Sequence, residues 1–133
     1  MNKDQQRVDV KKKLSSVSQE TLSEESRAIS RCLQSMASIE SSPTIMSFLP
    51  LKYEVDLRPI MQVWIEDGKT VCVPVINWES NSMQAGLLTT LESIGLVETR
   101  HGLMEPKDRQ IVPSDSIDVV LVPGLAFDQH CAR

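Results

Sequence analysis

The sequence has 133 residues, of which 41% are hydrophobic, 24% charged and 4% aromatic, and its net charge is −4. These values predict one globular domain with an aliphatic core, and the acidic balance argues against a nucleic-acid-binding protein. No apolar run reaches the roughly 18 residues of a membrane span, no signal peptide is seen, and three widely spaced cysteines without a CxxC motif favour reduced thiols in a cytoplasmic protein.

The first third of the chain predicts two helices. Residues 2–16 contain no Gly or Pro and favour a polar helix with a thin apolar face of Val10 and Leu14. The segment 21–24, TLSE, has the spacing of a capping box, and a second helix is expected to begin there and to end before SSP at 41–43. The apolar face of this second helix comprises Leu22, Ile29, Leu33 and Met36.

The middle of the chain predicts a strand, a helix and a strand. Residues 44–50 are short and apolar and end at a proline, which is typical of a buried strand. A helix is expected within 54–69, with Asp56 as a candidate cap and Gly68 as its stop. Its inner face comprises Ile60, Val63 and Trp64. The continuous apolar run at 70–76 is typical of a strand that is covered on both faces.

The last third predicts two more strands, one near SMQAGLL at 82–88 and a stronger one at 116–123. The segments LMEP, at 103–106, and DRQIVPSDS, at 108–116, are expected to be loops. Strands that alternate with helices indicate an α/β fold: a mostly parallel open sheet with helices on both faces, in three Rossmann-like layers. Ligands of such sheets bind beyond the carboxyl ends of the strands, here after Leu49, Val75 and Val122.

Two pairs of residues are candidates for binding. Lys3 and Arg7 are four residues apart, so on a helix they share one face and could clamp a phosphate; the alternative is a solvated helix face. Glu54 and Asp56 follow a strand end and could receive a cationic or hydrogen-bond-donating ligand; the alternative is helix capping by Asp56. The sequence leaves both alternatives open.

The segment near Arg133 gives weaker signals. Asp128, His130 and Cys131 do not match a usual zinc spacing, so no metal site is predicted. A Cys131–His130 nucleophilic pair would lack an orienting acid, and no Walker or GxGxxG motif occurs. From these residues alone, the prediction is an α/β domain with a site at the strand ends.

Four segments in order resemble the 5-formyltetrahydrofolate cyclo-ligase family, also called methenyltetrahydrofolate synthetase. They are the N-terminal Lys-x-x-x-Arg helix with the Ser/Glu-rich helix after it, IMSFLPLKYEVDLRPIM, GKTVCVPVI, and GLMEP followed by IDVVLVPGLAFDQHCAR. The resemblance implies an ATP- and magnesium-dependent cyclisation of 5-formyltetrahydrofolate to 5,10-methenyltetrahydrofolate, with release of ADP and phosphate. It implies no catalytic side chain, because the substrate's own atoms attack, and it implies a cytoplasmic monomer or weak dimer.

The resemblance also assigns site residues. Lys3, Arg7 and Arg133 match the family's ATP-binding positions, and Leu49 and Glu54 match its folate-contacting positions. In the family, the arginine matching Arg133 is followed by Leu-Gly-x-Gly-x-Gly-Tyr-Tyr-Asp. We therefore expect residues 1–133 to be a single incomplete cyclo-ligase domain that stops before this glycine-rich ATP loop, with the magnesium ligands beyond it.

Two rival functions stay open at this point. One is a non-catalytic folate- or nucleotide-binding or interaction module on the same half-fold. The other is a small-molecule thiol enzyme that uses Cys131.

Overall fold

The computed structural model describes residues 2–133. The α-helices are α1 (Lys3–Ser15), α2 (Gln19–Ser35), α3 (Ala37–Glu40) and α4 (Arg58–Glu66). The strands are β1 (Thr44–Met46), β2 (Thr70–Asn77), β3 (Ser82–Leu87), β4 (Leu96–Glu98), β5 (Met104–Pro106), β6 (Ile111–Val112) and β7 (Val119–Val120). Two single-turn 3-10 helices are η1 (Ser93–Gly95) and η2 (Ser114–Ser116).

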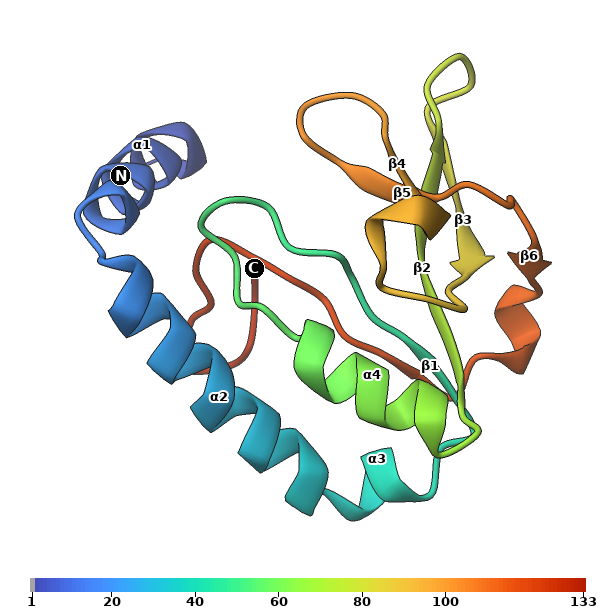
Figure 1. Ribbon diagram of the computed structural model, residues 1–133. Helices are drawn as coiled ribbons and strands as arrows, with labels where there is room; N and C mark the ends of the chain where they lie inside the picture. Colours follow the sequence, from blue (N-terminus) through green and yellow to red (C-terminus); the bar gives the residue numbers. More distant parts are fainter. Residues whose placement is uncertain (1) are drawn as a thin grey trace.

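The central sheet has the strand order β6-β3-β2-β1-β7 (Figure 1). β1 pairs in parallel with β2 and with β7, while β2–β3 and β3–β6 are antiparallel. β4 and β5 form a separate antiparallel hairpin. The unit β1–α4–β2 is a parallel crossover, and the predicted α/β class is confirmed.

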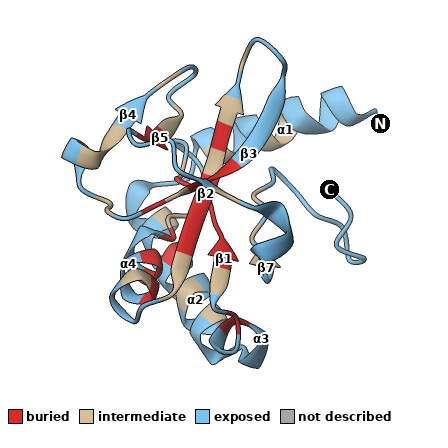
Figure 2. Ribbon diagram, turned by 90° about the vertical axis from the view of Figure 1, so that its right-hand side faces the viewer, coloured by how far each residue is buried: buried red, intermediate tan, exposed pale blue. Residues whose placement is uncertain are grey.

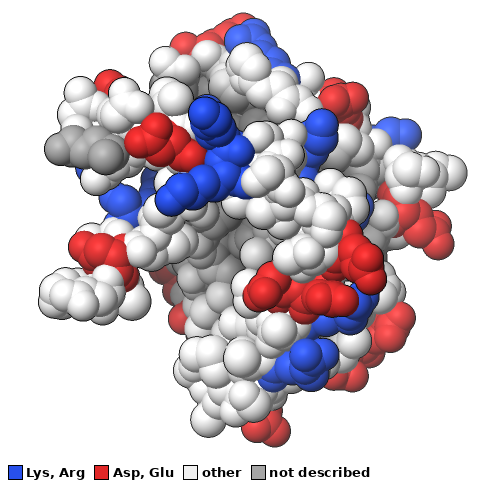
Figure 3. Space-filling view, turned by 90° about the vertical axis from the view of Figure 1, so that its left-hand side faces the viewer, with Lys and Arg blue, Asp and Glu red and all other residues white. Residues whose placement is uncertain are grey.

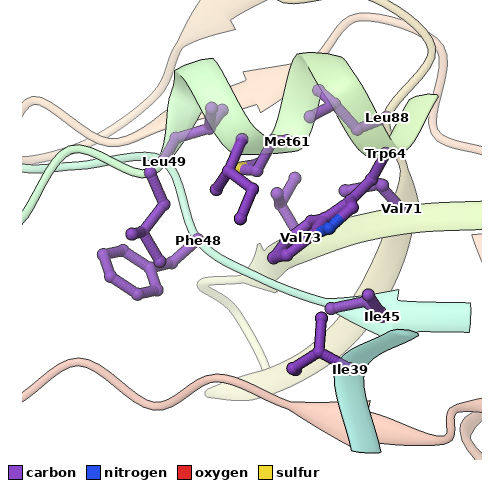
Figure 4. Close-up of a cluster of buried hydrophobic side chains, with 11 residues drawn as sticks. Ile39, Ile45, Phe48, Leu49, Met61, Trp64, Val71, Val73 and Leu88 are labelled. Atoms are coloured by element: carbon purple, nitrogen blue, oxygen red, sulfur yellow. The ribbon is translucent and has the colours of Figure 1, made fainter. Parts of the chain in front are cut away.

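The main core lies between the sheet and α4. Ile45, Val71 and Val73 of the strands pack against a face of α4 that contains Met61 and Trp64 (Figure 4). The other face of the sheet carries a smaller cluster beside η2, made of Met46, Cys72 and Ala85 with Val112 and Ile117 around it. Figure 2 shows burial concentrated along β1, β2 and the inner side of α4. The core is aliphatic, as the composition predicts.

The expected helix at 2–16 is confirmed as α1, but the expected start of α2 is wrong. α2 begins at Gln19, and its N-cap is Ser18, whose Oγ accepts the backbone N–H of Thr21 at 3.1 Å. A serine three residues earlier therefore satisfies the helix terminus that TLSE was expected to cap. α2 ends at Ser35, so Met36 lies outside it and is 47% exposed.

The inner face of α4 differs by one residue from the expected one. Ile60 and Trp64 are buried as predicted, but Val63 is 39% exposed and Met61 is fully buried. The helix begins only at Arg58. The buried side chains follow the three- and four-residue spacing of one helical stripe and are Leu57, Ile60, Met61 and Trp64. Gly68 is confirmed as the stop, with the positive φ of +85° that glycine adopts readily.

Two segments expected to be loops contain short strands. Residues 103–106 include β5, and residues 108–116 include the two-residue β6. Strands this short give no period-2 pattern, and both segments contain proline, which weakens a strand prediction. The strands expected at 70–76, 82–88 and 116–123 are present as β2, β3 and the shorter β7.

Cys32, Cys72 and Cys131 are free thiols. Cys72 is buried in the sheet, and this burial raises the pKa of its thiol to about 11. Among the helices of residues 2–133, none has the length and apolar character needed to cross a membrane.

Candidate functional site

An open groove of about 1480 Å³ lies on the side of the molecule that carries α1 and α2. Its walls come from α1, α2, the β1–α4 loop, the tip of the β4–β5 hairpin and the segment that follows β7. Figure 3 shows this side hollowed, with Lys and Arg side chains gathered beside the hollow. Four of the five site residues named from the sequence line the groove, namely Lys3, Arg7, Glu54 and Arg133.

The groove exists because the parallel strands open at one edge. The ladder between β1 and β2 ends at the pair Met46–Cys72, where Ser47 N–H donates to the Cys72 carbonyl at 2.8 Å. On the other side of β1, Leu121 N–H donates to the Met46 carbonyl at 2.8 Å. Beyond these bonds the chain leaves the sheet, so Phe48 and Leu121 line the groove at the carboxyl ends of β1 and β7.

α1 supplies the cationic wall. Lys3, Arg7 and Lys11 recur every four residues, which places them on one helix face, and all three line the groove. Val10 and Leu14 are half-buried on the same groove side, as expected for the apolar face of this helix. Lys11 extends the predicted pair of Lys3 and Arg7 by one helical turn, in a Lys-x-x-x-Arg-x-x-x-Lys pattern that is visible in the sequence.

Lys3 also contacts the far end of the chain. Its Nζ lies 3.5 Å from the carbonyl oxygen of Arg133. Arg7 Nη1 lies 3.0 Å from Asp4 Oδ1, in an ion pair whose side chains are 58% and 87% exposed. Exposed pairs of this kind contribute little stability, so an anionic ligand can compete for the Arg7 guanidinium.

The segment after β7 forms a tight loop around Asp128. Its Oδ1 accepts the backbone N–H groups of His130 at 2.8 Å and Ala132 at 2.9 Å. Cys131 in the same turn has a φ of +62°. The Arg133 side chain reaches back to the start of the loop, where its Nη1 donates to the Pro123 carbonyl at 3.1 Å. The Asp128 carboxylate therefore shapes the loop that presents Arg133 to the groove.

Gly124 lies close to two side chains of this loop. A Cβ atom added there would lie 2.6 Å from the Phe127 ring and 3.0 Å from the Arg133 side chain. A side chain at position 124 would therefore require the Phe127 ring, which is 51% exposed, to move.

Glu54 lies in the β1–α4 loop. Its Oε2 accepts the backbone N–H of Leu51 at 2.9 Å, and its own N–H donates to the Leu51 carbonyl at 3.0 Å. The turn at 51–54 holds the carboxylate at the groove wall. Leu49 lies differently from the other four residues: it is 8% exposed and packs in the main core, while Phe48, Pro50 and Leu51 line the groove.

The helix-capping role expected for Asp56 is wrong, because the N-cap of α4 is Leu57 and no side-chain hydrogen bond caps the helix; Asp56 binds Arg58 instead. Its carboxylate accepts two side-chain hydrogen bonds from Arg58 at 2.8 Å and the Arg58 backbone N–H at 3.0 Å. These bonds hold the pKa of the Asp56 carboxyl below its ordinary value, and they raise the pKa of Arg58. Ser26 Oγ accepts the Asp56 N–H at 2.9 Å and donates to the Leu22 carbonyl at 2.7 Å, which joins the loop to α2.

These walls suit a ligand that is both flat and anionic. Lys3, Arg7 and Arg133 supply cationic donors of the kind that bind phosphate oxygens. Phe48, Leu121 and Phe127 supply apolar and aromatic surface, and Glu54 supplies an acceptor for ring N–H groups.

The chain is similar to the proteins of one family. A family model described as the 5-formyltetrahydrofolate cyclo-ligase family matches residues 1–133. The mouse protein named 5-formyltetrahydrofolate cyclo-ligase is 25% identical over 132 residues, which cover 96% of this chain and 65% of that protein. The Escherichia coli protein of the same name is 32% identical over 95 residues, or 68% of this chain and 50% of that protein.

A solved structure has the same fold. The NMR structure of Aquifex aeolicus 5,10-methenyltetrahydrofolate synthetase aligns with a TM-score of 0.81 and 27% sequence identity, over 96% of this chain and 63% of that one. The chain thus spans between half and two thirds of the length of these relatives.

Proposed function

The chain belongs to the 5-formyltetrahydrofolate cyclo-ligase family, and from this premise we propose that its groove binds 5-formyltetrahydrofolate and ATP for the cyclisation to 5,10-methenyltetrahydrofolate. The observation that carries the proposal is the meeting of α1 with the loop after β7. Lys3 and Arg133 are 130 positions apart, yet Lys3 Nζ lies 3.5 Å from the Arg133 carbonyl oxygen, and both residues line the groove with Arg7.

The proposed reaction needs positioning rather than a protein nucleophile. The formamide oxygen of the folate attacks the γ-phosphorus of ATP, a new P–O bond forms, and the bond to ADP breaks. The adjacent folate nitrogen then attacks the activated formyl carbon and loses its proton, and phosphate leaves with the former formyl oxygen. Holding both reactants in line and neutralising phosphate charge are the tasks left to the protein.

The groove residues fit these two tasks. We assign Lys3, Arg7 and Arg133 to the phosphates of ATP, where cationic donors stabilise the charge of the transferring group. We assign Glu54 to the N–H-rich edge of the pterin ring, since a carboxylate accepts two parallel hydrogen bonds. For Leu49, the role that remains is support of the wall from the core.

Magnesium accompanies ATP in this proposal. Within residues 2–133, no three His, Cys, Asp or Glu side chains come together as a metal site. No residue and no step is assigned to the ion.

Turnover tests the proposal. The chain is mixed with ATP, magnesium and 5-formyltetrahydrofolate, and the methenyl product is followed by its near-ultraviolet absorbance. If the 133 residues suffice for turnover, Lys3→Met is expected to lower product formation, and substitution of Lys12, an exposed lysine of α1 outside the groove, by Met is expected to leave it unchanged. Binding of both ligands without product would place the missing chemistry outside these 133 residues.

Two results would contradict the proposal. One is that neither ligand binds. The other is that folate binds and ATP does not, which would indicate a folate-binding module instead of a cyclo-ligase.

A further inference from the structure

Glu105 is a buried carboxylate outside the groove. It is 1% exposed, and both of its oxygens have partners. Oε1 accepts the backbone N–H of Ile76 at 2.8 Å, and Oε2 accepts Arg109 Nη2 at 2.8 Å. Burying a carboxylate is costly unless it is paired and hydrogen-bonded, so this group calls for a structural or functional reason.

The reason lies on the open side of β2. Alternate residues of a strand bond to opposite neighbours, and Cys72 bonds to β1 through the Ser47 N–H. β1 then leaves the sheet, so the next positions on that side, Pro74 and Ile76, are not paired with β1. Pro74 has no N–H to satisfy, and the N–H of Ile76 is satisfied by Glu105. The carboxylate therefore accepts the one hydrogen bond that a neighbouring strand would otherwise accept from Ile76.

Glu105 is also part of the β4–β5 hairpin. It pairs with Val97 across the hairpin, and the hairpin lies beside β2 in Figures 1 and 2. At the tip, Thr99 N–H donates to the Leu103 carbonyl at 2.8 Å. His101 and Gly102, with φ of +58° and +78°, turn the chain and line the groove.

A second contact holds the tip. The Trp78 ring, from the loop after β2, meets the His101 ring edge-on at 5.7 Å, and the Arg100 guanidinium lies 5.3 Å from the centre of the Trp78 ring. The tip therefore contributes His101 and Gly102 to the lining of the groove, while Trp78 contacts both His101 and Arg100. Because the Arg100 guanidinium lies over the Trp78 ring, this wall suits an aromatic ligand better than a phosphate.

We propose that Glu105 is a positioning residue for folate: by binding Ile76 and Arg109 it fixes the β4–β5 hairpin on β2, so that His101 and Gly102 form the wall against which the folate rings pack. This inference rests on the proposed function for the identity of the ligand. The positioning itself rests on the contacts of Glu105 alone.

Hydrogen exchange and calorimetry together test the inference. The variants are Glu105→Ala, Glu105→Gln, which keeps an acceptor for Ile76, and Glu98→Gln as a control on an exposed residue of the same hairpin. In Glu105→Ala we expect the Thr99 amide to exchange roughly tenfold faster, while the Met61 amide of α4 is unchanged. We expect the dissociation constant for 5-formyltetrahydrofolate to rise roughly tenfold and that for ATP to stay the same.

The outcomes separate this inference from the proposed function. Unchanged exchange at Thr99 overturns the positioning role whether or not folate binds. Faster exchange with unchanged folate affinity, or equal losses for folate and ATP, overturns the role toward folate. If the unsubstituted chain binds no folate, the proposed function fails, and the exchange data still decide whether Glu105 fixes the hairpin. If Glu105→Ala does not fold, Glu105→Gln and Arg109→Met carry the same comparison.

Discussion

At the scale of single residues, Lys69 shows how a charged group that does not line the groove can stabilise the fold. Its Nζ donates to three carbonyl oxygens, those of Ile39 at 3.3 Å, Glu40 at 2.9 Å and Ser42 at 2.8 Å. These carbonyls lie at the end of α3 and in the turn before β1. The ammonium group therefore caps the chain just before it enters the central sheet.

We expect Lys69→Met to lower the free energy of unfolding by about 1–3 kcal/mol, because up to three charge-assisted hydrogen bonds are lost. The stability is measured by urea denaturation. Lys12→Met, on an exposed position of α1, is the control and is expected to change it by less than about 0.5 kcal/mol. Equal effects of the two substitutions would show that the contacts of Lys69 do not stabilise the fold.

Asp56 gives a pH-dependent prediction. Hydrogen bonds from Arg58 lower the pKa of its carboxyl in the folded state, so the carboxylate stabilises the fold at pH values above its unfolded pKa of about 3.9. As the pH falls through the lower folded pKa, this contribution is lost. We expect Asp56→Asn to destabilise the chain at pH 7 and the difference from the unsubstituted chain to shrink below about pH 4.

The measurement is urea denaturation of both chains from pH 7 downward. Asp67→Asn is a suitable control, because Asp67 is exposed. A difference that stays constant down to the lowest pH at which both chains fold would contradict the assigned role of the carboxylate.

Single residues also show what the sequence can and cannot predict. Lys3 and Arg7 have a helical spacing, which fits a phosphate clamp and a solvated face equally, and only the family resemblance favours the phosphate clamp. Glu54 follows a strand end, and the structure places it at the groove wall. Arg109 lies four residues from Glu105, but the backbone groups that Lys69 and Glu105 bind, those of Ser42 and Ile76, are distant in sequence and leave no local pattern.

At the scale of elements, the site depends on how the β1–α4 loop is tied to α2. Ser26 is the buried residue of α2, and its Oγ joins the Asp56 N–H to the Leu22 carbonyl. The loop that carries Glu54 is thereby attached to a regular helix. Such attachment reduces the freedom that a ligand would otherwise have to remove.

We expect Ser26→Ala to destabilise the chain by about 1–3 kcal/mol, because the Asp56 N–H loses its partner. Weaker folate binding should accompany this loss, since Glu54 lies in the same loop. Thermal unfolding and calorimetry measure the two effects, with the exposed Ser23→Ala as the control in the same helix. A variant as stable as the control would show that this hydrogen bond does not hold the loop.

The longer or more strongly patterned elements could be predicted, and the short ones could not. α1 and β2 are close to their expected bounds because Gly- and Pro-free composition or a continuous apolar run marks them. β5 and β6 form because β4, β3 and the Glu105 contact hold them in place. Their strand character comes from tertiary contacts and leaves no local pattern.

At the scale of the whole molecule, the groove is assembled from the two ends of the described chain. α1 supplies Lys3 and Arg7, and the segment after β7 supplies Arg133. The sheet could be anticipated from the alternation of strands and helices, and so could the edge at which the groove lies. The cavity could not, because no local pattern reports that the N-terminal helix lies across the loop after β7.

The central claim is that one groove holds two different ligands through different residues. Calorimetric titration of ATP with magnesium, and separately of 5-formyltetrahydrofolate, tests it on the unsubstituted chain and on Lys3→Met, Glu54→Gln and Lys12→Met. We predict that Lys3→Met weakens ATP binding by roughly tenfold or more and leaves folate binding unchanged. Glu54→Gln should weaken folate binding alone, and Lys12→Met should change neither. Binding of both ligands that neither Lys3→Met nor Glu54→Gln alters would contradict the account.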